Sequence, residues 1–561
     1  MASQSSVSKV WQVYPRPQLK RYNYVNLNGW WDFTICDSDT IPTEYSWQIQ
    51  VPFCPESELS GVKQQVSPGQ SLFYRRYFQR PAASGRVLLH VGAADQITSI
   101  YVNQKKLAVH EGGYTTFTVD ITEALQQENE LVIHCLDDLR SPRLPYGKQT
   151  LKPGGMWYTP VSGLWQTVWL EAVPEQYIRE LSIQVDLKAA KVTVTPPLDG
   201  QVLFEGKKLP LVNGTATLTP DSPRHWTPED PHLYDFTVET GEDRVESYFA
   251  LRTIEAKTVD GIPRLCLNGK PYFFHGLLDQ GYWPEGIYTP ASPEGYARDI
   301  IIAKTMGFNT LRKHIKVEPE EFYYQCDKLG MIVFQDMVNN GDYRFLRDTG
   351  LPGTVCKKRK DHRLHQDPDS RKAFLTSMEE TVQQLKNHPC ILYWTIFNEG
   401  WGQFEADKAY DRLRSLDASR IIDATSGWFW QNKSHVDSHH IYFGGWKAMK
   451  AQHRPVVLSE FGGFICPIPG HRFKEGKAFG YRYCATAEKF QQRLIKLYRK
   501  RILSAIPKGL SGAILTQLSD VEEEINGLVT YDRQVIKTDE ASMQSLARQL
   551  QDAVRSQDRC G

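Results

Sequence analysis

The chain has 561 residues, of which 41% are hydrophobic and 23% charged, and its formal net charge is +1. A chain of this length exceeds what one hydrophobic core usually supports, so we expect several domains. The net charge gives no global field that favours nucleic acid or an anionic membrane, and no apolar run of about 18 residues is present to span a membrane.

The N-terminal segment, MASQSSVSKVWQVYPRP, lacks the apolar stretch of a secretory signal peptide. Ten cysteines are scattered along the chain without a CxxC motif or a Cys/His cluster. These features predict free thiols, no structural zinc and a cytoplasmic location.

Residues 1–172 show many short strands separated by turns. RVLLHVGAA (86–94), TTFTVDI (115–121) and ELVIHCL (130–136) have the length and the apolar or alternating character of strands. Such a series is typical of a β-sandwich. Residues 173–255 continue in the same style, and their length fits a small immunoglobulin-like sandwich.

From residue 256 to residue 561 the pattern changes, and strands alternate with amphipathic helices. Eight strands are expected, at 272–277, 309–315, 331–337, 390–399, 420–426, 440–443, 455–463 and 511–520. Helices are expected at 293–308, 318–330, 370–388, 405–417 and 488–502. This alternation over about 300 residues is typical of a (β/α)8 barrel, also called a TIM barrel.

Polar residues stand at the ends of these expected barrel strands, where the active sites of such barrels lie. They include Asp279, Arg312, His314, Asp336, Asn398, Glu399, Tyr442 and Glu460. An aspartate at such a place could merely cap a helix. A glutamate is a poorer cap, so capping does not explain Glu399 and Glu460 well.

Two carboxylates that face each other across a barrel mouth are the machinery of glycoside hydrolysis. One attacks the anomeric carbon, and the other protonates the leaving oxygen and later activates water. The amide of Asn398, beside Glu399, could bind the sugar 2-hydroxyl in the transition state. A structural salt bridge is the alternative role for Glu399.

The sequence resembles glycoside hydrolase family two, the family of β-galactosidases, β-glucuronidases and β-mannosidases. The segments that carry the resemblance include YPRPQLKRYNYVNLNGWWDF (14–33), SGLWQTVWLE (162–171), MGFNTLRKHI (306–315), HPCILYWTIFNEG (388–400), RPVVLSEFGG (454–463) and TQLSDVEEEINGLVTYDR (516–533). The resemblance implies a jelly-roll-like sandwich over 1–172, an immunoglobulin-like sandwich over 173–255 and a catalytic barrel over 256–561. It also implies retention of anomeric configuration through a covalent glycosyl-enzyme.

Matched position by position, the resemblance implies Glu399 as the acid/base and Glu460 as the nucleophile. Asn398 matches the partner of the sugar 2-hydroxyl, and Tyr442 is similar to a tyrosine beside the nucleophile. Four further residues look like the lining of the sugar-binding subsite: His275, Asp279, Arg312 and His314. Each of these four could instead be a strand-end salt bridge or a cap.

The sugar specificity is open at this point. The family's glucuronidases carry an Asn-x-Lys motif, and EINGLVTYDRQVIK has no clean copy of it. The family's galactosidases usually carry His three residues after Arg, whereas Arg312 and His314 are two apart. Arg312, His314 and Lys316 share strand parity. This cationic cluster could bind a uronate carboxylate, or it could neutralise acids such as Asp336.

The leading interpretation is an exo-acting retaining β-glycosidase for a small oligosaccharide or glycoside, most like a β-galactosidase, with no metal and no cofactor. The alternatives are a β-hexuronidase on the same machinery, a carbohydrate-binding protein without turnover, and a metal-dependent hydrolase using the cluster SHH (438–440). A homo-oligomer is left open. Loop 338–369 is expected to border the aglycone side. Trp401 and Trp428 could stack on a sugar or pack at the rim.

Overall fold

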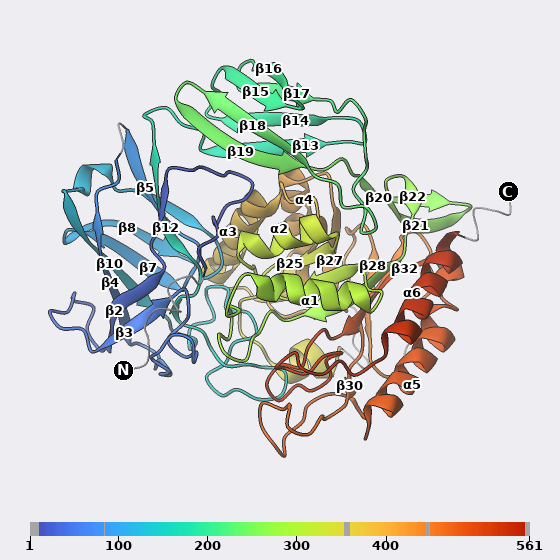
Figure 1. Ribbon diagram of the computed structural model, residues 1–561. Coiled ribbons are helices and arrows are strands. Elements are labelled where there is room, and N and C mark those ends of the chain that lie inside the picture. Colours follow the sequence, from blue (N-terminus) through green and yellow to red (C-terminus); the bar gives the residue numbers. More distant parts are fainter. Residues whose placement is uncertain (1–10, 83–84, 353–358, 445, 447–448, 556–561) are drawn as a thin grey trace.

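The computed structural model describes residues 11–82, 85–352, 359–444, 446 and 449–555. Two β-sandwiches flank a barrel: the N-terminal sandwich is blue in Figure 1, and the second sandwich, in teal and green, lies above the barrel. Among the helices of these described residues, none is long and apolar enough to cross a membrane. The fold class expected from the sequence is confirmed.

The N-terminal sandwich consists of two main antiparallel sheets. One sheet has the order β1 (Tyr24–Asn26), β12 (Val168–Val173), β5 (Arg86–Val91), β9 (Phe117–Asp120). The other has the order β3 (Trp47–Val51), β2 (Gly29–Cys36), β4 (Ser71–Gln79), β10 (Glu128–Leu136), β7 (Ile97–Val102), β8 (Lys105–Glu111). A short pair, β6 (Ala94–Asp95) and β11 (Gly163–Leu164), accompanies them. Apolar residues from both main sheets, such as Phe33 and Leu89, form the core.

The second sandwich packs a three-stranded sheet against a four-stranded one. Their orders are β13 (Glu180–Val185), β14 (Ala190–Thr195), β17 (Thr215–Leu218), and β16 (Lys207–Leu211), β15 (Gly200–Phe204), β18 (Tyr234–Thr240), β19 (Asp243–Phe249). A separate sheet of β20 (Ile254–Val259), β21 (Ile262–Leu267) and β22 (Lys270–Pro271) leads into the barrel. The domain boundary expected at 255/256 therefore falls inside β20, and the three domain ranges stay a prediction.

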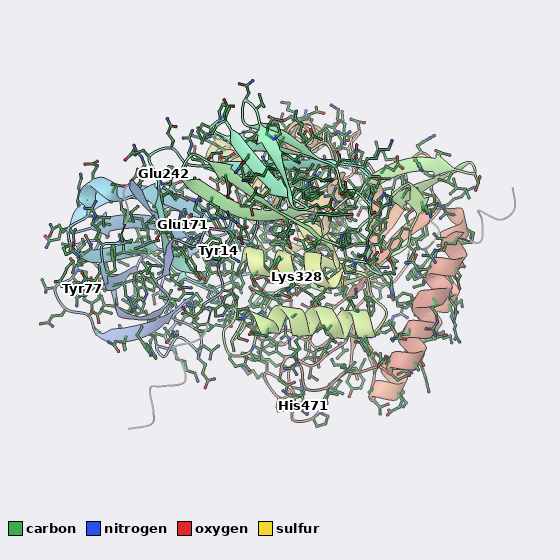
Figure 2. The ribbon with its side chains drawn as sticks, turned by 45° about the horizontal axis from the view of Figure 1, so that its top comes forward. Tyr14, Tyr77, Glu171, Glu242, Lys328 and His471 are labelled. Carbon is green, nitrogen blue, oxygen red and sulfur yellow. The ribbon has the colours of Figure 1, made fainter. Side chains whose placement is uncertain are left out.

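A buried charge cluster ties the N-terminal segment to both sandwiches (Figure 2). Glu171 in β12 accepts a hydrogen bond from Tyr14 at 2.6 Å and pairs with Arg16 at 2.8 Å and Arg21 at 2.9 Å. Arg21 also pairs with Asp243 of the second sandwich at 2.8 Å. Because each charge here has a partner, attraction within the cluster offsets the cost of withdrawing these groups from water.

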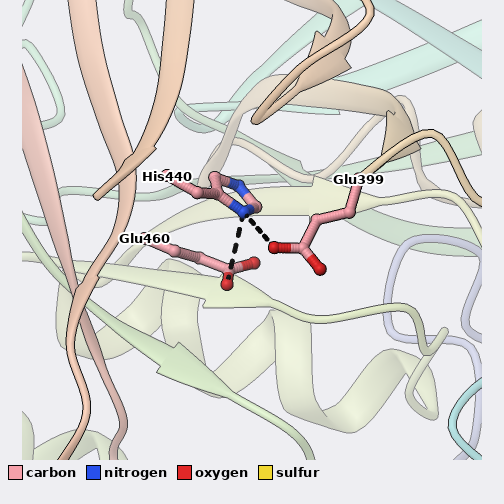
Figure 3. Close-up of side chains that lie close together, drawn as sticks. All are labelled: Glu399, His440 and Glu460. Atoms are coloured by element: carbon pink, nitrogen blue, oxygen red, sulfur yellow. Dashed lines mark hydrogen bonds and ion pairs between the residues drawn. The ribbon is translucent and has the colours of Figure 1, made fainter. Parts of the chain in front are cut away.

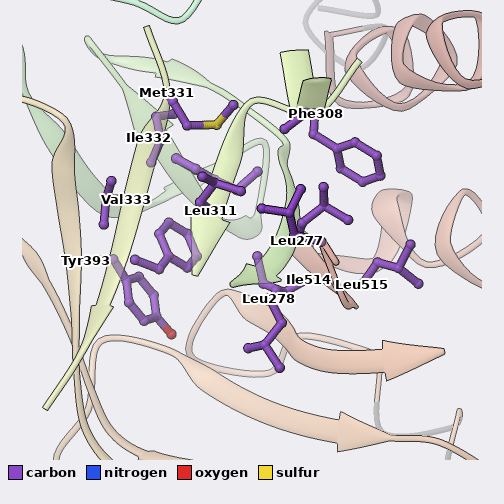
Figure 4. Packing of buried hydrophobic residues seen from close by; sticks show 14 of the residues in the cluster. Leu277, Leu278, Phe308, Leu311, Met331, Ile332, Val333, Tyr393, Ile514 and Leu515 are labelled. Carbon is purple, nitrogen blue, oxygen red and sulfur yellow. The ribbon is translucent and has the colours of Figure 1, made fainter. Parts of the chain in front are cut away.

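The barrel is an eight-stranded parallel sheet whose buried apolar side chains pack together (Figure 4). Its strands in sheet order are β27 (Ile421–Ser426), β26 (Ile391–Asn398), β25 (Ile332–Asp336), β24 (Thr310–Lys313), β23 (Phe274–Asp279), β32 (Leu510–Thr516), β29 (Val456–Gly462) and β28 (Asp437–Ile441). Every strand expected from the sequence is present within a few residues of its expected bounds.

Helices cover the outside of the barrel. They are α1 (Glu294–Thr305), α2 (Glu320–Leu329), α3 (Pro368–Leu385), α4 (Ala406–Leu416), α5 (Ala487–Leu497) with the π-helix η6 (Tyr498–Ile502), and α6 (Glu540–Arg555). The first five match expected helices, and α2 ends as expected at Gly330, which has a left-handed conformation. Helix α6 was not predicted.

The two ends of the sheet order, β27 and β28, are joined by side chains and have no backbone ladder between them. Ser426 of β27 places its Oγ 2.9 Å from His440 Nε2 and 3.4 Å from Ser438 Oγ, both in β28. We call this contact line the β27–β28 seam. It runs beneath the residues described next.

Candidate active site

The two predicted glutamates lie side by side at the mouth of the barrel. Glu399 follows β26 directly with a positive φ of 53°, and its N–H donates to the carbonyl of Ser426 at 2.9 Å. Glu460 lies within β29 and is 5% exposed. Side-chain oxygens of both glutamates and a ring nitrogen of His440 lie within 4.8 Å of one another. Retaining glycosidases hold their two carboxyl groups about 5–5.5 Å apart.

His440 bridges the two glutamates (Figure 3). Its Nδ1 is 2.7 Å from Glu399 Oε1 and 3.4 Å from Glu460 Oε2. Its Nε2 is 3.4 Å from Nη1 of Arg312, which can only donate, so we assign Nε2 as the acceptor and the ring proton to Nδ1. His440 therefore donates to the carboxylates. The sequence indicated SHH (438–440) only as a possible metal cluster, and His440 was not assigned to the catalytic pair, although it shares strand parity with Tyr442.

Arg312 binds several of the polar side chains of the site. It is 1% exposed and donates to Asp336 Oδ1 at 2.9 Å, to Glu460 Oε1 at 3.1 Å and to Asn398 Oδ1 at 2.8 Å. Burial disfavours its charge, but Asp336 and Glu460 outweigh that effect and raise the pKa of Arg312. Because the oxygen of Asn398 is taken, its amide N–H groups are available to a ligand.

Glu460 is held in its ionised form. Burial disfavours the carboxylate, but His440, Arg312 and His314 and a hydrogen bond outweigh this effect and lower the pKa of Glu460 to about 2. That bond comes from Tyr442, whose hydroxyl donates to Oε2 at 2.6 Å. An ionised carboxylate with both oxygens held in place is suited to act as a nucleophile.

The cationic cluster of Arg312, His314 and Lys316, in and just after β24, is occupied by protein partners. Arg312 binds the acids described above, and His314 Nδ1 is 2.9 Å from Asp336 Oδ2. Lys316 donates to Glu318 at 2.9 Å and to two backbone carbonyls. Of the two roles considered for this cluster, neutralising nearby acids is the one that these contacts support.

Two predicted subsite residues lie away from the glutamates. Asp279 pairs with Lys313 at 2.6 Å, and Lys313 lies 4.2 Å from the ring centroid of Phe322 in α2. His275 contacts the hydroxyl of Tyr498 at 3.0 Å, and burial lowers the pKa of its imidazole to about 3. Positions 275 and 279 share strand parity, so both side chains face the helices. We therefore remove His275 and Asp279 from the proposed subsite.

Aromatic side chains form the rim on the side of Glu399. The ring centroid of Trp157 lies 4.8 Å from that of Tyr343 and 5.1 Å from that of Trp401. Trp401 donates to a carbonyl of loop 338–369 at 3.1 Å, and Trp428 donates to another at 2.7 Å. Both tryptophans are at most 4% exposed, so these contacts favour rim packing. Residues 353–358 of the loop lie outside the described part of the chain.

The spacing of Glu399, His440 and Glu460 would also suit a metal ion. However, Nδ1 of His440 is engaged with Glu399, and both oxygens of Glu460 accept hydrogen bonds from Arg312 and Tyr442. The atoms that a metal would need are thus used within the protein. The donor set fits a hydrogen-bonded pair of carboxylates better than a metal centre.

Comparisons with known proteins agree with the fold described above. A family model described as "Glycosyl hydrolases family 2, TIM barrel domain" matches residues 262–551, and one described as "Glycosyl hydrolases family 2" matches residues 175–252. A β-galactosidase of Thermoanaerobacter pseudethanolicus is 24% identical over 384 residues, which are 62% of this chain and 47% of that protein. A putative β-glucuronidase of Formosa agariphila is 27% identical over 349 residues, which are 57% and 38%.

The chain thus spans about half or less of the length of these two curated relatives. Among solved structures, a β-glucuronidase of Ruminococcus gnavus is similar with a TM-score of 0.76 and 17% identity, over 97% of this chain and 99% of that one. This last similarity is one of fold.

Proposed function

This chain belongs to the glycosyl hydrolases of family 2, and from that premise we propose that it is an exo-acting, retaining β-glycosidase. The observation that carries the proposal is the pair Glu399 and Glu460 at the barrel mouth, with side-chain atoms within 4.8 Å and with Glu460 held as a carboxylate. This spacing matches the retaining arrangement, in which no water fits between the carboxylate and the sugar.

In the proposed first step, Glu460 attacks the anomeric carbon and forms a glycosyl ester. The bond to the aglycone oxygen breaks, and Glu399 gives that oxygen its proton. In the second step, Glu399 takes a proton from water, and the water oxygen displaces Glu460 from the anomeric carbon. The enzyme returns to its starting state, and two inversions give net retention.

The surrounding residues support these steps by position and charge. Arg312 and Tyr442 fix the two oxygens of Glu460. His440 donates to Glu399 once that residue is a carboxylate, which fits its second role as a base. The free amide of Asn398 can bind the sugar 2-hydroxyl more strongly as charge develops on the ring.

The sequence favours a galactosidase-like glycone, with a hexuronide as the alternative. The names of the curated relatives include both classes, so they do not choose between them. The carbohydrate-binding alternative has no use for an ionised nucleophile beside an acid. For the metal-dependent alternative, the candidate donor group among the described residues is Glu399, His440 and Glu460, whose atoms are already engaged with protein partners. A retaining hydrolase accounts for all these contacts.

The test is hydrolysis of a panel of p-nitrophenyl β-glycosides by the wild type and by Glu460→Gln. The panel comprises galactoside, glucuronide, galacturonide, glucoside, mannoside and fucoside. We expect at least one sugar to be hydrolysed, and the variant to lose at least about a thousandfold in kcat. Glu242→Gln, at a glutamate remote from the site, is the matched control. Equal activity of the two variants would refute the assignment of Glu460, and no turnover of any sugar would favour binding alone.

Two further expectations remain proposals. The described cysteines, eight in number, are all free thiols, which supports the proposed cytoplasmic location. Assembly into a homo-oligomer stays a prediction.

A further inference from the structure

A loop of the N-terminal sandwich brings a lysine to the barrel mouth. The N–H groups of Tyr146 and Gly147 donate to the carbonyl of Asn339, beyond β25, at 3.1 and 3.4 Å. A Cβ on Gly147 would lie 3.0 Å from the carbonyl of Ile315, next to His314, so only glycine allows this close approach. The next residue, Lys148, is thus held over the ends of β24 and β25.

Within the described part of the chain, the ammonium of Lys148 has no counter-ion. Lys148 is 9% exposed, and among the described residues no hydrogen bond or ion pair to its ammonium is found within the usual distances. The aromatic ring of Trp157 lies 5.6 Å away. Withdrawing an ammonium from water costs roughly several kcal/mol unless a partner compensates. Arg312 and Lys316, by contrast, are fully occupied by acids and carbonyls.

The acid near Lys148 already has other partners. Glu524 accepts hydrogen bonds from the hydroxyl of Tyr158 and from Asn526, the latter at 2.9 Å. Burial raises the pKa of Glu524, and Lys148 opposes this rise without reaching ion-pair distance. Tyr158 is in turn tied to Lys148, because its N–H donates to the lysine carbonyl at 2.9 Å.

The charge of Lys148 also acts on a residue of the barrel mouth. Burial lowers the pKa of His314, and the charge of Lys148 contributes to that decrease. His314 uses Nδ1 for Asp336, which leaves Nε2 for a ligand. The charge of Glu460 also raises the pKa of Glu524. Because Gly147 packs against Ile315, which follows His314 in the chain, Lys148 lies near His314 and the mouth that holds Glu460.

We propose that Lys148 binds the carboxylate of a uronic acid glycone, with His314 Nε2 as a second contact, so that the substrates are β-hexuronides. The inference rests on the proposed glycosidase function and names its substrate class. A carboxylate at the ammonium would supply the counter-ion that the described residues do not provide, through a charge-assisted hydrogen bond. The cation comes from the N-terminal sandwich, which explains why the barrel sequence needs no Asn-x-Lys motif.

The experiment compares kcat/KM for aryl β-glucuronide, β-galacturonide, β-glucoside and β-galactoside in the wild type, Lys148→Met and Lys148→Arg. Lys328→Met, at a surface lysine of α2, is the matched control. We expect the wild type to prefer one uronide over its neutral counterpart. Lys148→Met should lose roughly tenfold to hundredfold on the uronide alone, and Lys148→Arg should retain part of the preference.

Two results would overturn the inference and leave the glycosidase proposal intact: turnover of neutral sugars in preference to uronides, or an equal loss on both classes in Lys148→Met. Binding of free glucuronate, galacturonate and galactose by calorimetry provides a readout that is independent of turnover. Uronate binding that is abolished in Lys148→Met supports the inference even if no glycoside is hydrolysed, which would count against the proposed function alone. Uronates that bind no tighter than galactose would overturn it.

Discussion

A buried histidine behind the active site should make the stability of this protein depend on pH. His388, just before β26, is fully buried, and its Nδ1 lies 2.7 Å from Asp327 Oδ2. Asp327 also accepts a hydrogen bond from Tyr248 of the second sandwich at 2.7 Å. Burial opposes the charge of His388, but Asp327 and then Glu320 outweigh it and raise the pKa from 6.5 to about 9.

The sign and size of the pH dependence follow from the difference between the pKa of His388 in the folded chain and its ordinary value. A histidine whose pKa is higher in the folded chain stabilises the fold fully below pH 6.5, and this contribution is lost as the pH rises through 9. At 1.36 kcal/mol for each pH unit between the two values, the contribution is about 3 kcal/mol. We expect His388→Asn to remove most of it.

Urea unfolding followed by tryptophan fluorescence, at several values between pH 6 and about 9.5, measures the effect. The wild type should lose stability across this range, and the difference between the wild type and His388→Asn should shrink as the pH rises. His225→Asn, at an exposed histidine, is the control for the loss of one imidazole. If the free energies of unfolding of the wild type and His388→Asn differed by the same amount at every pH, the charged state of His388 would be refuted.

Two further predictions concern the site and the seam. Tyr442→Phe removes the hydrogen bond to Glu460, so we expect kcat to fall roughly tenfold to hundredfold and the acid limb of the pH–rate profile to move to higher pH. An unchanged kcat would contradict this role. Ser426→Ala removes the link across the β27–β28 seam and should lower the free energy of unfolding by about 1 kcal/mol, with faster amide hydrogen exchange in β28 as the readout. Exchange rates equal to those of the wild type would show that the seam is held by other contacts.

The sequence allowed the barrel strands to be predicted because each is an apolar run of strand length between turn or helix signals. Helix α6 was missed even though Met543, Leu546 and Leu550 recur at helical spacing and are buried. The glutamates were found from their places at strand ends together with the family resemblance. That resemblance, without a check of strand parity, added His275 and Asp279 to the expected subsite, whereas their side chains contact Tyr498 and Lys313.

Other parts of the site depend on contacts that no local pattern reveals. His440 owes its role to Glu399, which lies 41 positions away in the chain. Lys148 lies in a loop of the N-terminal sandwich, and it reaches the mouth through the hydrogen bonds to Asn339 and the packing of Gly147 against Ile315. The occupied state of Arg312 and Lys316 likewise comes from tertiary contacts.

The β27–β28 seam gives His440 two tasks at once. One ring nitrogen contacts Ser426 and so links β28 to β27, the two ends of the sheet order, while the other contacts the catalytic pair. A substitution at position 440 that alters the catalytic chemistry must therefore also preserve the contact between β27 and β28. Compensating substitutions would have to arise at Ser426 and Ser438. We therefore expect residues 426, 438 and 440 to change together in evolution, whereas the sandwich loop that carries Lys148 can change independently of them.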